Sequence, residues 1–196
     1  MGSQSKDRME LLRIERDVKE CKNCDLWKTR TKPVVGDGLL DAPVMFIGEA
    51  PGYHEDLQGK PFVGKAGKLF DELLLSIGLQ RKNVYVANVL KCRPPDNRDP
   101  LDSEIKACTP FLDRQLVLIQ PRVIVTLGNF AWSYISKKFG LPMERIGKIH
   151  GYVFRIKALL FDSQVVPMYH PAAAVYNPEL KKELLDDFKT IIKTMA

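Results

Sequence analysis

Short apolar runs alternate with longer amphipathic stretches along this chain, and that alternation predicts a fold. Four of the runs are rich in valine and isoleucine and are bounded by glycine, proline or polar residues, as buried strands are. These predicted strands span residues 43–48, 83–89, 122–128 and 164–169.

Between the runs, apolar residues recur at helical spacing. In the stretch 64–77, Leu69, Leu73 and Ile77 share one face, and Gly78 can end the helix. Further helices are predicted for residues 5–20, from Asp102 or Ser103 to near Gln120, from Asn129 onward and from Pro178 onward. The remaining segments predict loops at 25–42 and 93–100, and a hairpin or irregular β structure at 145–161.

Strands that alternate with helices favour one α/β domain, over residues 1–196, with a mostly parallel sheet of four strands. In such sheets the ligand lies beyond the carboxyl ends of the strands. The predicted strands end at Gly48–Glu49, near Asn88, at Gly128 and at His170. Polar residues from distant parts of the chain therefore collect at one edge of the sheet, where we expect the site.

The composition is that of an ordinary globular protein. Of 196 residues, 45% are hydrophobic and 28% are charged, which excludes a disordered chain and a disulfide-built miniprotein. No apolar run approaches the ~18 residues of a membrane span, and the charged start of the chain argues against a signal peptide. We therefore expect a cytoplasmic protein, and interpret residues 1–4 as disordered or as an extension of the natural sequence.

The chain is basic. It has 30 Lys and Arg against 24 Asp and Glu, a net charge of +6, which favours a polyanionic partner. The excess of positive charge is concentrated in residues 137–157, which contain six basic residues and only one acidic residue, Glu144. Such a segment is more often a solvated face than a binding surface, and its role depends on whether the active site lies beside it.

Four cysteines, Cys21, Cys24, Cys92 and Cys108, lie at element ends or in loops. The C-x2-C pair in a charged, loop-like setting is typical of metal ligands, and buried or unpaired thiols are the alternative. Disulfides are not expected without a secretion signal. Structural zinc usually has two close pairs, whereas the second pair here is wide, which favours an iron–sulfur cluster. From the residues alone, both metals stay open.

The segment Gly59–Ala66 nearly matches the phosphate-binding loop G-x4-G-K-[ST]. Ala66 replaces the hydroxyl that would hold magnesium, and no predicted strand directly precedes the loop, so we reject a nucleotide triphosphatase. A weaker expectation survives: backbone amides at the start of the 64–77 helix, with Lys65 and Lys68, can hold a phosphate.

A second glycine-rich turn, residues 48–52, directly follows the first strand. Gly48 and Gly52 permit a close approach of the backbone to a ligand. Glu49 and Glu55 follow the same strand end, which makes them candidate acid–base groups. Solvated carboxylates with no role are the alternative interpretation.

Together these segments resemble a known family. Residues 48–52, residues 59–67, Asn88 and the segment His170–Pro178 are similar, in the same order, to the family 4 uracil-DNA glycosylases, the iron–sulfur enzymes of thermophilic archaea and bacteria. The cysteine spacing resembles theirs too, and the resemblance covers about residues 10–190. It implies a three-layer α/β/α sandwich, a [4Fe–4S] cluster on the four cysteines, and a DNA-repair hydrolase that removes uracil and leaves an abasic site.

The resemblance also implies a uracil pocket, into which the base must be flipped out of the duplex. Phe62 resembles the family's stacking aromatic, with a core phenylalanine as the alternative, and Asn88 matches the residue that reads uracil. Glu55 corresponds to an acidic residue near uracil C5. His170, at the end of the fourth strand, is expected to stabilise the charge that develops on the departing uracil.

The group that activates water is not evident. Better-known members of the superfamily have an aspartate where this chain has Ala50, which with Gly48 is expected to line the uracil pocket. Glu49 is the first candidate for the base and Glu55 the second, and backbone carbonyls remain open.

The segment beginning at His170 resembles a loop that wedges into the minor groove of the duplex. Relatives often have leucine where this chain has Ala174, a smaller plug, so Val175 or Tyr176 are candidates to take over. Candidate phosphate contacts are Lys65, Lys68, Arg93 and the segment 137–157. Contacts of this kind predict strongly salt-dependent binding.

Two other functions stay open at this point. One is a non-catalytic, cluster-bearing nucleic-acid-binding module. The other is a glycosylase for hypoxanthine or mismatched bases, against which Asn88 and Glu55 argue. The expected partner is uracil-containing DNA, single- or double-stranded, and the expected state is a monomer. A sliding clamp or another repair protein is a conceivable partner, although the chain has no convincing clamp-binding peptide.

Overall fold

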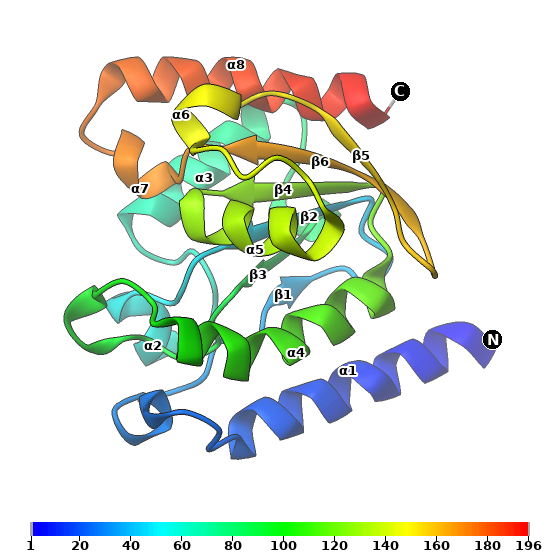
Figure 1. The fold of residues 1–196 in the computed structure, drawn as a ribbon, viewed down its shortest axis with the longest axis vertical. Coiled ribbons are helices and arrows are strands. Elements are labelled where there is room, and N and C mark those ends of the chain that lie inside the picture. Colours follow the sequence, from blue (N-terminus) through cyan, green and yellow to red (C-terminus); the bar gives the residue numbers. More distant parts are fainter. Residues whose placement is uncertain (1, 196) are drawn as a thin grey trace.

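The structure is a computed structural model that describes residues 2–195, with side chains from Asp7 onward. Within these residues the core is a six-stranded sheet in the order β1-β3-β2-β4-β6-β5 (Figure 1). Its four central strands run parallel, and they are β2 (Val44–Gly48), β3 (Tyr85–Asn88), β4 (Val123–Leu127) and β6 (Asp162–Met168). The four strands expected from the apolar runs are therefore confirmed.

Two short strands extend the sheet beyond the predicted four. The strand β1 (Asp37–Gly38) pairs antiparallel with β3, and β5 (Phe154–Lys157) pairs antiparallel with β6. Because β1 is two exposed residues long and has no apolar alternation, no pattern in the sequence indicates it. Within residues 145–161, expected to form a hairpin or irregular β structure, the chain forms the short helix α6 (Ile146–Ile149) and the single strand β5, whose hairpin partner β6 lies outside that range.

Helices cover both faces of the sheet, which gives the expected α/β/α sandwich (Figure 1). One face carries α3 (Lys65–Ser76) and α8 (Pro178–Met195), and the other carries α4 (Asp102–Ile119) and α5 (Asn129–Phe139). Strand β2 is apolar throughout because successive side chains enter different cores. Phe46 packs with α3 and α8, whereas Met45 and Ile47 pack with α4 and α5.

The connections at the carboxyl ends of the strands contain short helical segments. Two of them are α2 (Tyr53–Gln58) and α7 (Pro171–Ala174). Single 3₁₀ turns occupy Asp25–Lys28, Arg81–Asn83 and Pro95–Asn97. A helix, α2, precedes Gly59, so the strand that a phosphate-binding loop requires is indeed missing there.

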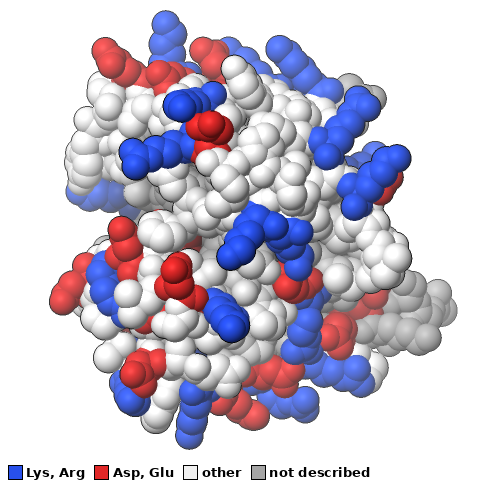
Figure 2. All heavy atoms as spheres, in the orientation of Figure 1, with Lys and Arg blue, Asp and Glu red and all other residues white. Residues whose placement is uncertain are grey.

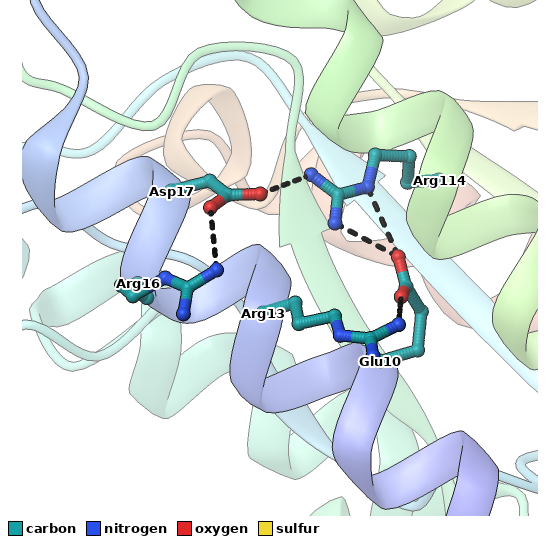
Figure 3. A network of polar contacts seen from close by, with 5 residues as sticks. All are labelled: Glu10, Arg13, Arg16, Asp17 and Arg114. Atoms are coloured by element: carbon teal, nitrogen blue, oxygen red, sulfur yellow. Dashed lines mark hydrogen bonds and ion pairs between the residues drawn. The ribbon is translucent and has the colours of Figure 1, made fainter.

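Helix α1 (Gly2–Glu20) lies outside the sandwich, against α4 (Figure 1). Its Ile14 and Val18 are buried in a third apolar cluster. Arg114 of α4 reaches two carboxylates of α1, with N–O distances of 2.8 Å to Glu10 and 2.6 Å to Asp17 (Figure 3). The hydrogen bonds from Arg114 lower the pKa of both carboxyls. One arginine therefore fastens the outer helix along two of its turns.

The basic segment 137–157 does not form one patch beside the strand ends, and this expectation needs correction. Helix α6 lies near the carboxyl end of β6, where the ring of His150 is 4.7 Å from that of Tyr169. Lys157, however, pairs in register with Asp162, at the opposite end of β6. Figure 2 shows Lys and Arg spread over the viewed face and interleaved with Asp and Glu.

Two remaining expectations concern the start of the chain and a membrane. Met1 lies outside the described residues, whereas residues 2–4 belong to α1 rather than to a disordered end. No helix in the described part of the chain is long and apolar enough to cross a bilayer.

Candidate active site and cysteine site

The candidate site forms where the parallel strands end. Gly48 at the end of β2 lies opposite Asn88 at the end of β3. Gly128 follows β4, and a Cβ added to it would lie 3.2 Å from the Cβ of His170, which follows β6. The predicted convergence of these strand ends is therefore confirmed.

Asn88 presents an unused hydrogen-bonding group. Asn88 is 3% exposed, and its Oδ1 is buried with no hydrogen-bond partner among the described residues. A Cβ added to Gly48 would lie only 2.4 Å from this oxygen, so glycine keeps the space beside the amide open. A buried acceptor without a donor costs about 1–3 kcal/mol, and a ligand that supplies the donor recovers this energy.

Phe62 borders the same space. Its ring is 6% exposed, stacks on the ring of His170 at 5.5 Å with an interplanar angle of 22°, and would touch a Cβ on Gly48 at 3.1 Å. Its backbone is left-handed, with φ 55°, which costs a residue with a side chain about 1–2 kcal/mol. Gly67 permits this loop to pack closely, since a Cβ there would lie 1.8 Å from the Phe62 oxygen.

The surroundings of His170 define its protonation. The backbone N–H of Ala172 donates to Nδ1 over 3.1 Å, which requires an unprotonated Nδ1 and leaves the proton on Nε2. Burial lowers the pKa of this imidazole to about 4, and the nearby charge of Glu55 opposes that shift. His170 is therefore neutral at neutral pH and carries one N–H donor that no described residue uses.

Glu49 lies half-buried directly after β2. Burial raises the pKa of its carboxyl to about 7, and the charge of Asp99 contributes in the same direction. Its backbone oxygen accepts from the N–H of Leu90 over 2.9 Å, which continues the pairing of β2 with the segment after β3. A carboxyl that titrates near neutral pH at the edge of a site has the property of a general base.

Glu55 has a different position from Glu49. Its Oε1 accepts from the backbone N–H groups of Val63 and Gly64, at 2.9 and 3.0 Å. This carboxylate thus takes up the amide of Gly64, the N-cap of α3, and places a negative charge at the helix start, which disfavours the phosphate expected there. Glu55 anchors the loop of Phe62, and its charge also reaches His170.

The expected DNA-contact residues fall into exposed and buried members. Lys65 donates from Nζ to the hydroxyl of Tyr176 over 2.7 Å, and Tyr176 is 78% exposed. Ala174 is 2% exposed and packs in the core, so its side chain does not reach the surface and cannot act as the plug. Val175 is half-buried against the same core.

The other two expected contacts lie on separate elements. Lys68 is exposed on α3, near the start of that helix. Arg93 follows β3, lies 5.2 Å from the ring centroid of Tyr53, and donates to Asn97 over 2.7 Å. Gly48 ends β2 and lies against Phe62 and Asn88, and Ala50 follows two residues later in the turn after the strand.

All four cysteines line one cavity between α1, α4 and the segment after β3, and all are free thiols. Two of the sulfurs accept hydrogen bonds: Cys92 from the guanidinium of Arg30 at 3.2 Å, and Cys108 from the backbone N–H of Lys91 at 3.1 Å. No group of three or more His, Cys, Asp or Glu among the described residues is arranged to hold a metal ion.

Two residues that support the site escaped the sequence analysis. Arg81 contacts the loop of Phe62. Lys91 is buried, and its Nζ donates to the backbone oxygen of Asn88 at 2.8 Å and to the side-chain oxygen of Gln115 at 2.6 Å. Burial lowers the pKa of Lys91 to about 8. A lone basic residue in a sequence gives no signal of such contacts.

Known proteins of one superfamily are similar to this chain over most of its length. Residues 35–192 match the uracil DNA glycosylase superfamily. The type-4 uracil-DNA glycosylase of Sulfurisphaera tokodaii is 50% identical over 184 residues, which cover 92% of this chain and 83% of that protein. The type-4 enzyme of Archaeoglobus fulgidus is 49% identical over 178 residues, 91% of this chain and 89% of that protein. The type-5 uracil-DNA glycosylase of Pyrobaculum aerophilum is 32% identical over 171 residues, 79% of this chain and 72% of that protein. The chain belongs to the type-4 uracil-DNA glycosylases.

Proposed function

We propose that this protein flips uracil out of DNA and hydrolyses its N-glycosidic bond, which leaves an abasic site for base excision repair. The observation that carries the proposal is the unpaired Oδ1 of Asn88 beside Gly48, next to the stacked rings of Phe62 and His170. A flat base with one hydrogen-bond donor and one acceptor on its edge can pair with the amide of Asn88 while its face lies beside the rings of Phe62 and His170.

Asn88 would read the edge of the base. Its Oδ1 accepts from uracil N3–H, and its amide NH2 donates to uracil O4. Cytosine presents the opposite pattern, with an acceptor at N3 and a donor at N4, so both bonds would fail. Each buried group left unpaired costs about 1–3 kcal/mol, which predicts discrimination of roughly 10²-fold or more.

Phe62 and Glu55 would shape the rest of the pocket. The phenylalanine ring offers a stacking face, and Glu55 holds that loop through the amides of Val63 and Gly64. We infer that Glu55 also lies near C5 of the bound uracil, where it would exclude the methyl group that thymine carries at this position.

His170 would stabilise the leaving group. Because Nδ1 already accepts from Ala172, the free Nε2–H is the group that donates to uracil O2 as negative charge develops there. A neutral donor suits this task, and the low pKa of His170 keeps it neutral. As uracil departs with the bonding electrons, the sugar that remains in the strand gains oxocarbenium character, so water needs only weak activation to attack it.

Glu49 is our choice for the group that orients and deprotonates that water. Its pKa of about 7 makes the carboxylate available at neutral pH while it remains a competent proton acceptor. The Oε1 of Glu55 accepts from two backbone amides and holds the loop of Phe62, so Glu55 is less free than Glu49 to contact the water.

DNA contacts would come from the exposed residues around the pocket. Tyr176, held by Lys65, is the candidate for the wedge, with Val175 packed behind it. Lys65, Lys68 and Arg93 are the candidate phosphate contacts. Neutralising phosphates releases counterions, so affinity should fall steeply with salt.

We propose that Cys21, Cys24, Cys92 and Cys108 hold a [4Fe–4S] cluster. Four free thiols around one cavity, two of them accepting hydrogen bonds, have the chemistry of thiolate ligands. A structural zinc ion on the same four thiols is the alternative, and the wide spacing of Cys92 and Cys108 in the sequence favours the cluster. The cluster would act structurally, by tying α1 to the chain after β3. A brown protein supports the cluster, and a colourless one with bound zinc contradicts it.

We also propose one domain over residues 1–196, acting as a monomer in the cytoplasm of a prokaryotic cell. The continuous sheet and its two helical layers support one domain. The organisms of the type-4 relatives support the prokaryotic setting.

The test of the activity uses single- and double-stranded oligonucleotides with one uracil, followed by alkali. Strand breaks at uracil support the proposal. Binding without breaks, under varied salt and temperature, would favour a non-catalytic module instead. Oligonucleotides with hypoxanthine or mismatched bases distinguish a broader glycosylase, and His170→Ser is the control that should lose most activity and retain the cysteine site.

A further inference from the structure

One arginine from a distant part of the chain holds the loop that carries Phe62. Arg81 begins the 3₁₀ turn that precedes β3. Its Nη1 donates to the carbonyl oxygen of Pro61 at 2.9 Å. Its Nη2 donates to the carbonyl oxygen of Phe62 and lies 3.4 Å from that of Gly67. Two carbonyl oxygens of the loop and one from the first turn of α3 thus converge on a single guanidinium.

The guanidinium itself is firmly oriented. Its Nε donates to Oδ1 of Asp71 on α3 at 2.6 Å, and its Cζ lies 5.4 Å from the ring centroid of Phe70. Phe70 in turn is 5.1 Å from the ring of Phe62. The planar fork of arginine, with five N–H donors, satisfies these partners together, and the point charge of lysine cannot.

Phe62 requires outside support because of its backbone. A φ of 55° is unfavourable for a residue with a side chain, and the loop would otherwise relax toward ordinary backbone angles. Relaxation would turn the Phe62 ring away from Gly48. The ring now lies so close to Gly48 that a Cβ added to this glycine would be 3.1 Å from the Cζ of Phe62. Arg81 binds the carbonyl oxygens on both sides of the strained φ and ψ angles, which fixes the peptide planes that define them.

We propose that Arg81 is a positioning residue for base stacking: it holds Phe62 in the left-handed conformation that directs the ring over the pocket. This inference rests on the proposed stacking role of Phe62. Arg81 itself contacts no reacting group. Since it begins the segment that continues into β3 and ends at Asn88, one stretch of chain sets both the stacking face and the amide that reads the base.

A double-mutant cycle tests the inference. The rate of uracil release is measured in a single turnover at saturating DNA for four proteins: wild type, Arg81→Lys, Phe62→Leu and the double variant. Arg81→Lys keeps the charge, so DNA affinity should stay within about twofold while the rate falls about 10- to 100-fold, as for a small misplacement in an active site. In the Phe62→Leu background the same change should cost less than about threefold, because no ring remains to be oriented. Lys82→Ala, an exposed neighbour in the same turn, should leave the rate unchanged.

Each outcome decides the matter. Additive losses would mean that Arg81 acts independently of Phe62, which overturns the inference and leaves the proposed function intact. A wild-type rate in Phe62→Leu would refute the stacking role, and the inference with it. Arg81→Ala with added guanidinium separates orientation from folding: partial recovery of the rate supports the inference, and a folded variant that guanidinium does not rescue counts against it.

Discussion

Glu49 allows a prediction in which stability and activity change in opposite directions. Glu49→Gln keeps the shape of the side chain and removes its charge. In the folded protein the pKa is about 7, above the ordinary value of 4.5, so folding favours the neutral carboxyl. The stability that this group contributes is complete below pH 4.5 and is lost as the pH rises through 7.

The size of the effect follows from the two pKa values. A change from 4.5 to about 7 corresponds to roughly 3 kcal/mol, and solvent access to this half-buried group reduces the figure to about 1–3 kcal/mol. Glu49→Gln should therefore be more stable than wild type by about that amount at pH 8 and nearly equal to it at pH 4.5. Denaturant unfolding at the two pH values measures the difference.

Activity should respond in the opposite sense. In wild type the single-turnover rate should rise with pH through about 7 as Glu49 ionises, and His170 should add no limb until about pH 4. In Glu49→Gln the rise of the rate near pH 7 should disappear from the pH profile, and the single-turnover rate should fall by about 10²-fold. Glu72→Gln, an exposed carboxyl on α3 paired with Lys181, is the matched control and should behave as wild type. A Glu49→Gln enzyme with a wild-type rate and profile would refute the assigned role.

Three further predictions address recognition, DNA contact and the outer helix. Asn88→Asp should lower the rate on uracil by at least about 10²-fold, because a carboxylate cannot donate to uracil O4, and competition between uracil and cytosine substrates checks this. Tyr176→Ala should weaken binding to duplex more than to single-stranded DNA, as fluorescence anisotropy can measure, whereas Tyr152→Ala, also an exposed tyrosine, should not. Arg114→Met should speed hydrogen exchange of α1 by removing both ion pairs, and protection equal to wild type would contradict the role drawn from Figure 3.

The central sheet could be predicted because burial on both faces leaves a plain signal. Strand β2 is apolar at successive positions, since each side chain enters a core. The edge strands leave no such signal: β1 is exposed, and its place depends on pairing with β3. Burial in a core can be inferred from composition, whereas edge pairing is decided by the rest of the fold.

The site was predictable in its residue types but not in its contacts. The sequence indicated Phe62 and Glu55, yet not that Glu55 accepts from the amides of Val63 and Gly64 just before α3. Ala174 was named for its position after His170, but its burial depends on how α7 packs against α8. The role of Arg81 depends on bringing together residues far apart in the chain, which no local pattern specifies.

The most direct test of the account is the identity of the base that the protein releases. Duplexes that differ only in carrying uracil, thymine, cytosine or hypoxanthine at one position should be incubated with the protein, and the free base measured by mass spectrometry. The account predicts release of uracil alone, with an abasic site left in the strand, and loss of that release in Asn88→Asp. No released base, or equal release of cytosine or hypoxanthine, would contradict it.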